Sequence, residues 1–127
     1  MANVFDTFPK TLRIGPYDWR IKLIPGLKDE KGEELAGQCD ERGFSLEFNP
    51  DEAIHPFPLL AMETVLHEIH HAVFSVCSFQ PGDTEERICT LHARMMTQIY
   101  RDNPCLLDWM GAIVSGTRTW WGGSRDA

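Results

Sequence analysis

The 127-residue sequence lacks long apolar runs and clustered basic residues. Charged residues break every apolar stretch before the roughly 18 residues that a membrane-spanning helix needs, so we expect no membrane contact. The 12 Lys and Arg residues are scattered and the net charge is −7. Because neutralising phosphates requires grouped basic side chains, this charge pattern argues against nucleic acid as a partner.

We also expect no signal peptide, and the sequence contains no CxxC pair. Asp6 and Lys10 interrupt any apolar leader at the start of the chain, which favours a cytoplasmic location. The spacing of the four cysteines argues against a zinc ribbon or a thioredoxin-type motif, and free thiols are expected in a reducing compartment. Length and composition predict one globular domain over residues 1–116, followed by a loosely ordered tail over residues 117–127.

Alternating apolar residues predict a small sheet in the first half of the chain. Residues 11–14 and 19–24 alternate on either side of a Gly15-Pro16 break, which is typical of a hairpin of two antiparallel strands. A further strand is expected at residues 44–48, where every second residue is apolar and those side chains share one face. The sequence therefore predicts an antiparallel sheet of about three strands.

Three helices are expected in the second half. Pro56 and Pro58 confine the start of the first helix to residues 57–60, and apolar residues at three- and four-residue spacing continue to about Ser78. Asp83 or Thr84 can cap a second helix that ends before Asn103-Pro104. A third, shorter helix is predicted over residues 105–114. The fold class is therefore α+β.

The first helix carries an HExxH motif at residues 67–71. Residues four apart lie on one side of a helix, so His67 and His71 can present two imidazoles to one cation. Glu68 stands beside them with a carboxylate able to handle a water. The helical wheel turns His67 and His71 away from the apolar stripe, and it places His70 outside the site.

Zinc in a catalytic site usually has three protein ligands, so two histidines require a third. The residues that could supply it lie downstream, where a second helix antiparallel to the first would bring its first turn near the motif. They are Asp83, Glu85, Glu86 and His92.

In this respect the sequence resembles the gluzincins, whose HExxH helix is followed by a helix that supplies a glutamate. Glu86 and the residues up to Ala93 fit the pattern of that second helix, which makes Glu86 the implied third ligand and Glu85 the alternative. Thr90 departs from the Asp or Asn that the family prefers for holding the first histidine. The overall layout is similar to that of minimal phage and prophage metallopeptidases and of the ImmA/IrrE proteases, so a host cytoplasm is a further implied location.

The resemblance implies a zinc-dependent peptidase with a zincin-like fold, in which the sheet packs against the HExxH helix and the glutamate-bearing helix. Bound Zn²⁺ would activate a water, Glu68 would act as general base and then general acid, and a peptide or protein would be the substrate. Tyr17, His92 and Tyr100 are candidates for stabilising the oxyanion. Substrates of such enzymes lie along a strand edge, which would make residues 44–48 the platform.

Two other interpretations stay open. The protein could be a catalytically inactive zinc-binding module with a regulatory or scaffold role, although such a site would not need the carboxylate of Glu68. It could also be a metal-free adaptor whose Trp120-Trp121 pair docks a partner. The substrate, the cleavage site and the oligomeric state do not follow from the sequence.

Overall fold

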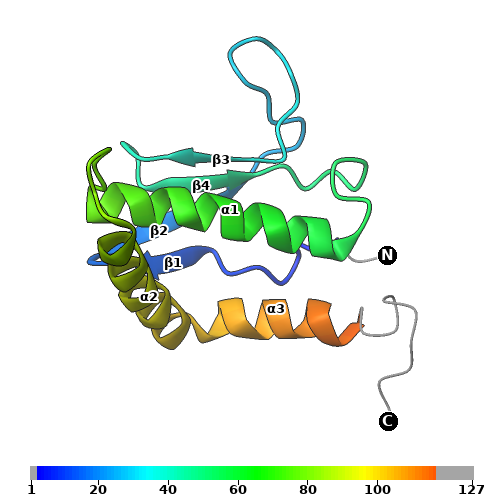
Figure 1. Ribbon diagram of the computed structural model, residues 1–127. Helices are drawn as coiled ribbons and strands as arrows, with labels where there is room; N and C mark the ends of the chain where they lie inside the picture. The colour runs from blue at the N-terminus through cyan, green and yellow to red at the C-terminus, as the bar shows by residue number, and fades with distance from the viewer. Residues whose placement is uncertain (1–2, 117–127) are drawn as a thin grey trace.

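Four strands and three helices make up residues 3–116, the part of the chain that this computed structural model describes (Figure 1). The predicted tail at residues 117–127 lies outside the described residues. In chain order the elements are β1 (Thr11–Ile14), β2 (Tyr17–Leu23), β3 (Gly37–Asp40), β4 (Ser45–Phe48), α1 (Pro58–Cys77), α2 (Glu85–Asp102) and α3 (Pro104–Gly116). The α+β class is confirmed.

The sheet has the strand order β1-β2-β4-β3 and is mixed. The predicted hairpin is present, since β1 and β2 pair antiparallel with Ile14 opposite Tyr17. The expected three-stranded antiparallel sheet is wrong in two respects. A fourth strand, β3, pairs antiparallel with β4, and β4 pairs parallel with β2.

The parallel pair arises from the long link between β2 and β3. Residues 24–36 carry the chain past the neighbouring position to the far edge, and the following turn returns β4 into the gap. Leu46 and Phe48 on β4 are fully buried, which suits a strand with a neighbour on each side. Phe44 precedes β4 with a φ of 50° and packs on Tyr17. The strand predicted at residues 44–48 is therefore central, and β3 forms the edge.

Helix α1 matches the predicted first helix. It begins at Pro58, where the missing N–H costs no helical hydrogen bond, and Ser78 follows its last residue in a left-handed conformation with φ 52°. Its buried face packs across one face of the sheet (Figure 1). That face consists of Ala61, Val65, Glu68, Ile69, Ala72 and Val73.

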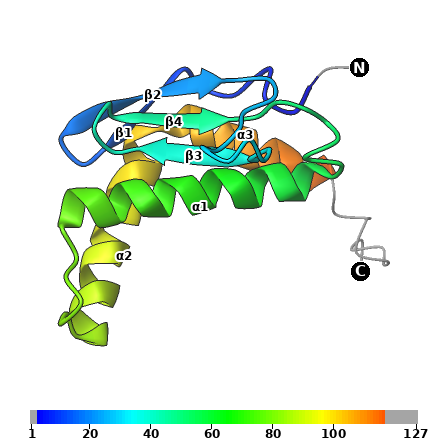
Figure 2. The same ribbon diagram turned by 90° about the horizontal axis from the view of Figure 1, so that it is seen from above.

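The other two helices also match their predicted ranges. The Thr84 hydroxyl caps α2 by accepting a hydrogen bond from the Arg87 N–H at 3.2 Å. Ile99 is the one buried residue of α2, and Met95, Met96 and Tyr100 are partly buried against the core. The N-terminal turns of α2 project past the C-terminal end of α1, away from the sheet (Figure 2). Three apolar residues of α3 are buried: Leu106, Trp109 and Ile113.

An aromatic cluster ties the N-terminal segment to the sheet and to α3. Phe5 stacks on Phe48 with ring centroids 5.6 Å apart, and Phe8 meets the Trp109 ring edge-on at 4.8 Å. The indole N–H of Trp109 donates a hydrogen bond to the Val4 carbonyl at 2.7 Å. Phe5 and Phe8 are therefore part of the core.

No described helix combines the length and apolar character that crossing a membrane requires.

Candidate metal centre

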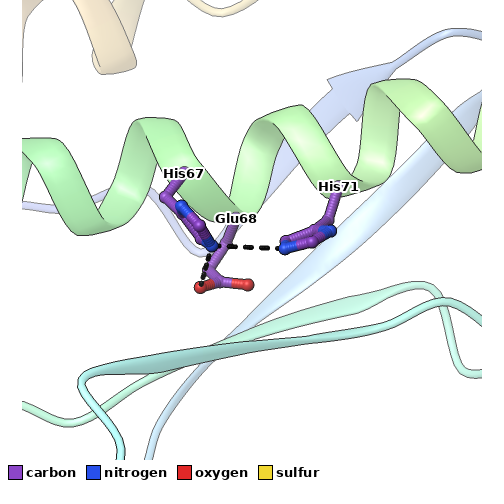
Figure 3. A group of neighbouring side chains, drawn as sticks. All are labelled: His67, Glu68 and His71. Atoms are coloured by element: carbon purple, nitrogen blue, oxygen red, sulfur yellow. Dashed lines mark hydrogen bonds and ion pairs between the residues drawn. The ribbon is translucent and has the colours of Figure 1, made fainter.

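His67, Glu68 and His71 leave α1 on the same side and form one group (Figure 3). One potential ligand atom from each residue lies within 4.8 Å of the others. The Nε2 atoms of the two histidines are 3.2 Å apart, and His67 Nε2 is 4.0 Å from a carboxylate oxygen of Glu68. The two imidazoles and the carboxylate are therefore close enough to bind one metal ion together.

The three side chains differ sharply in burial. The His67 side chain is 68% exposed and that of Glu68 is 8% exposed. This difference follows from the helical wheel, because Glu68 belongs to the buried face of α1 while His67 and His71 lie beyond it. Solvent can reach the histidines, whereas the carboxylate is held against the protein.

Burial raises the pKa of Glu68 above its ordinary value, and the nearby His67 and His71 partly oppose this rise. A negative charge at this position therefore costs free energy in the folded chain, because a carboxylate loses hydration when it is buried. A cation bound by the two histidines would offset that cost. The electrostatics of the group are thus suited to a divalent metal ion.

His70 is outside the group, as expected. Its Nδ1 forms a hydrogen bond with the Leu66 carbonyl, and its ring stacks on His92 of α2 with centroids 4.7 Å apart. Burial, followed by the nearby His70, lowers the pKa of His92. These two residues form a contact between α1 and α2 rather than part of the candidate site.

The predicted third ligand, Glu86, is not gathered with the histidines. It lies exposed on the first turn of α2, as does Glu85. Among the described residues, the group that could hold a metal contains His67, Glu68 and His71 alone. The α2 turn that carries Glu86 points away from the sheet (Figure 2), so ligation by Glu86 stays a prediction.

Strand β3 approaches α1 closely at Gly37, a residue that the sequence did not single out. A Cβ atom added to Gly37 would lie 2.9 Å from Thr64 Cγ2 and 3.1 Å from Glu68 Cγ. A cleft opens at this approach, lined by Ala36, Gly37, Glu63, Thr64, His67 and Glu68. The sequence could have pointed to Glu63, because it lies four residues before His67 and therefore on the same face of α1. The sequence could not have pointed to Gly37, because its role depends on the contact between β3 and α1, which lie far apart in the chain.

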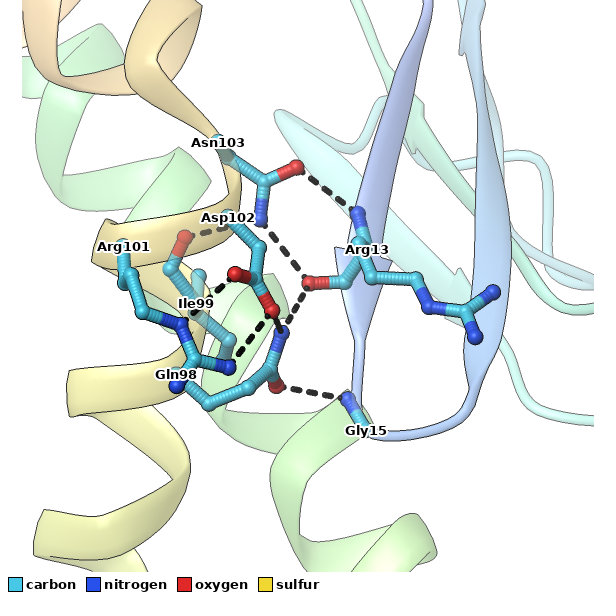
Figure 4. A network of polar contacts seen from close by, with 7 residues as sticks. All are labelled: Arg13, Gly15, Gln98, Ile99, Arg101, Asp102 and Asn103. Atoms are coloured by element: carbon cyan, nitrogen blue, oxygen red, sulfur yellow. Dashed lines mark hydrogen bonds and ion pairs between the residues drawn. The ribbon is translucent and has the colours of Figure 1, made fainter.

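The two edge strands of the sheet, β1 and β3, differ in whether other residues bond to their outer backbone groups. At the β1 edge, the Asn103 side chain accepts a hydrogen bond from the Arg13 N–H at 2.7 Å and donates one to the Arg13 carbonyl at 2.8 Å (Figure 4). Gln98 adds bonds to Arg13 and to the Gly15 N–H. At the β3 edge, no hydrogen bond between described residues occupies the outer backbone groups. The open edge is the one beside the histidines.

None of the three predicted oxyanion stabilisers lines the cleft. Tyr17 packs on Phe44 with ring centroids 4.5 Å apart, and Tyr100 packs against the core. His92 stacks on His70. Stabilisation of an oxyanion by any of them stays a prediction.

Comparisons with known protein families, curated proteins and solved structures yielded no match to this chain.

Replacing Gly37 by alanine should destabilise the fold by about 1–3 kcal/mol, because the new methyl group would overpack the contact with Thr64 and Glu68. Thermal unfolding measures the effect. Gly82→Ala is the matched control, since a Cβ atom there would meet nothing within 4 Å. Equal stability of the two variants would contradict the close approach of β3 to α1.

Asn103→Ala should lower the free energy of unfolding by about 2–3 kcal/mol, since the part-buried N–H of Arg13 and the buried Ile99 carbonyl each lose a hydrogen bond. Urea denaturation would measure this loss. Gln38→Ala, at an exposed position on β3, should change stability by less than about 0.5 kcal/mol. An unchanged midpoint for Asn103→Ala would show that the amide does not fasten α2 to the sheet.

Proposed function

We propose that this protein is a zinc-dependent peptidase of the gluzincin type. The observation that carries the proposal is the 3.2 Å separation of the His67 and His71 Nε2 atoms beside the buried Glu68. Two nitrogens at 2.0–2.1 Å from one tetrahedral zinc would be about 3.3 Å apart. The separation of the two nitrogens is therefore compatible with one zinc ion.

Zinc held by His67 and His71 would polarise a peptide carbonyl and make a water acidic enough to ionise near neutral pH. The chain itself supplies the proton transfer. Glu68 accepts the proton of the water and then returns it to the leaving amine. The position of Glu68 suits it to this role, because a general base must lie close to the proton that it accepts and Glu68 lies within reach of both histidines.

The substrate is proposed to bind along β3, in place of the strand at residues 44–48 that the sequence favoured. β3 is an edge strand, and its Gly37 lies against Glu68. An extended peptide could add to this edge through main-chain hydrogen bonds, which would bring its backbone beside the histidines. The opposite edge is unsuitable because Asn103 and Gln98 already bond to it.

A third zinc ligand is proposed to come from the first turn of α2, from Glu86 in preference to Glu85. The hydrogen bonds of Asn103 and Gln98 tie the C-terminal end of α2 to β1. Its N-terminal end has few buried residues, so that end is the part of α2 that can approach the histidines at low cost.

Glu86→Ala should weaken zinc binding by at least about 10- to 100-fold, because a lost ligand costs no less than the lost partner of a ligand, which costs this much. Competition with a chromogenic chelator gives the affinity. Glu85→Ala is the matched control and should bind zinc as the unaltered protein does. If Glu85→Ala alone weakens binding, the roles are exchanged, and if neither does, α2 supplies no carboxylate ligand.

The alternative function is a zinc-binding regulatory or scaffold module without turnover. Such a module would need the two histidines but not a base. The position of Glu68, buried within reach of both histidines, favours the peptidase.

Glu68→Gln separates these functions. The variant should retain about one zinc per chain, measured by elemental analysis, and lose peptide hydrolysis by at least about 100-fold, because a general base contributes 10²–10⁴-fold. His67→Ala is the control that should lose zinc as well. Full activity in Glu68→Gln would refute hydrolysis by this mechanism, and absence of zinc from the unaltered protein would favour the metal-free adaptor.

A further inference from the structure

A cleft of about 330 Å³ continues directly from the candidate metal centre. His67 and Glu68 belong to both, and Ala36, Gly37, Glu63 and Thr64 complete its lining. A peptide bound along the β3 edge would pass beside this cleft, so one of its side chains could enter it. The residues that line the cleft determine which substrate side chain it can bind.

One side of the cleft is lined by short, apolar groups. Ala36 offers only a methyl group, and Gly37 offers no side chain. The hydroxyl of Thr64 donates a hydrogen bond to the Leu60 carbonyl at 3.0 Å, and its methyl group is the first atom that a Cβ added at Gly37 would meet. A substrate side chain lying here would contact aliphatic groups along its length.

The wall of the cleft nearer the start of α1 carries Glu63. This residue is exposed, and no hydrogen bond or ion pair engages its carboxylate among the described residues. No lysine or arginine lines the cleft. An apolar side chain placed there would desolvate the carboxylate without compensation, whereas a cation would pair with it.

We infer that the cleft binds a lysine or arginine side chain of the substrate, with its aliphatic stem along Gly37 and Thr64 and its cation at Glu63. Lysine and arginine combine these two properties, an apolar stem and a charged end. The net charge of −7 adds a field that attracts basic peptides. This inference rests on the proposed peptidase function and assigns its substrate class.

The test measures peptide binding to the zinc-loaded, full-length Glu68→Gln protein. This substitution prevents turnover and removes the other carboxylate of the cleft, so a preference for a cation reports on Glu63. Peptides that carry lysine at each position in turn are compared with peptides that carry norleucine, which has a similar shape but no charge. At one position lysine should bind about 3- to 10-fold more tightly.

Variants of Glu63 assign that preference to its carboxylate. Adding Glu63→Gln should abolish the difference between lysine and norleucine, and Glu63→Lys should favour a glutamate peptide instead. Glu52→Lys is the control for overall charge, since Glu52 is exposed and lines a different cavity; it should keep the preference for lysine.

Equal binding of lysine and norleucine peptides at every position would overturn the inference and leave the peptidase proposal intact. A lysine preference that survives Glu63→Lys would overturn it as well. If no peptide binds to the zinc-loaded variant and none is cut by the unaltered protein, both the inference and the proposed function fail.

Discussion

The packing of α1 across the sheet determines how everything else in this structure is arranged. Val65, Ile69, Ala72 and Val73 are fully buried there, and each large apolar side chain contributes about 1.5–3 kcal/mol when it is removed from water. This packing fixes the rotation of the helix about its own axis. A turn of 100°, equivalent to one residue, would expose part of that face and bury His67. The direction of the site residues is therefore set by apolar contacts on the other side of the helix.

The sheet edges show how the same fold can be closed on one side and open on the other. An exposed strand edge invites pairing with other chains, and proteins usually cover it. Here the amide of Asn103 takes the place of a neighbouring strand along β1, bonding to both the N–H and the carbonyl of Arg13. β3 has no such cover among the described residues. An open edge is a liability unless it receives a ligand, and this one lies beside the two histidines.

The burial of Glu68 is costly, because its carboxylate is nearly shielded from water and its pKa is raised for that reason. A buried glutamate here does not stabilise the fold, since burying an uncharged side chain of similar size would cost less free energy. It is consistent with a site in which a bound cation balances the charge. Gly37 makes the arrangement sterically feasible, because any larger residue there would press on the stem of Glu68.

Local features were predictable from the sequence, and contacts between distant segments were not. The apolar period of residues 58–77 predicted α1, and helix geometry alone places His67 and His71 on one side, because residues four apart are neighbours on any helix. The parallel β2–β4 pair, the edge position of β3 and the role of Gly37 were decided by the tertiary structure. No local sequence pattern shows that β4 would occupy the position between β2 and β3, which the long link at residues 24–36 leaves open. The position of Glu86 is of the same kind, because it depends on the direction in which α2 leaves α1.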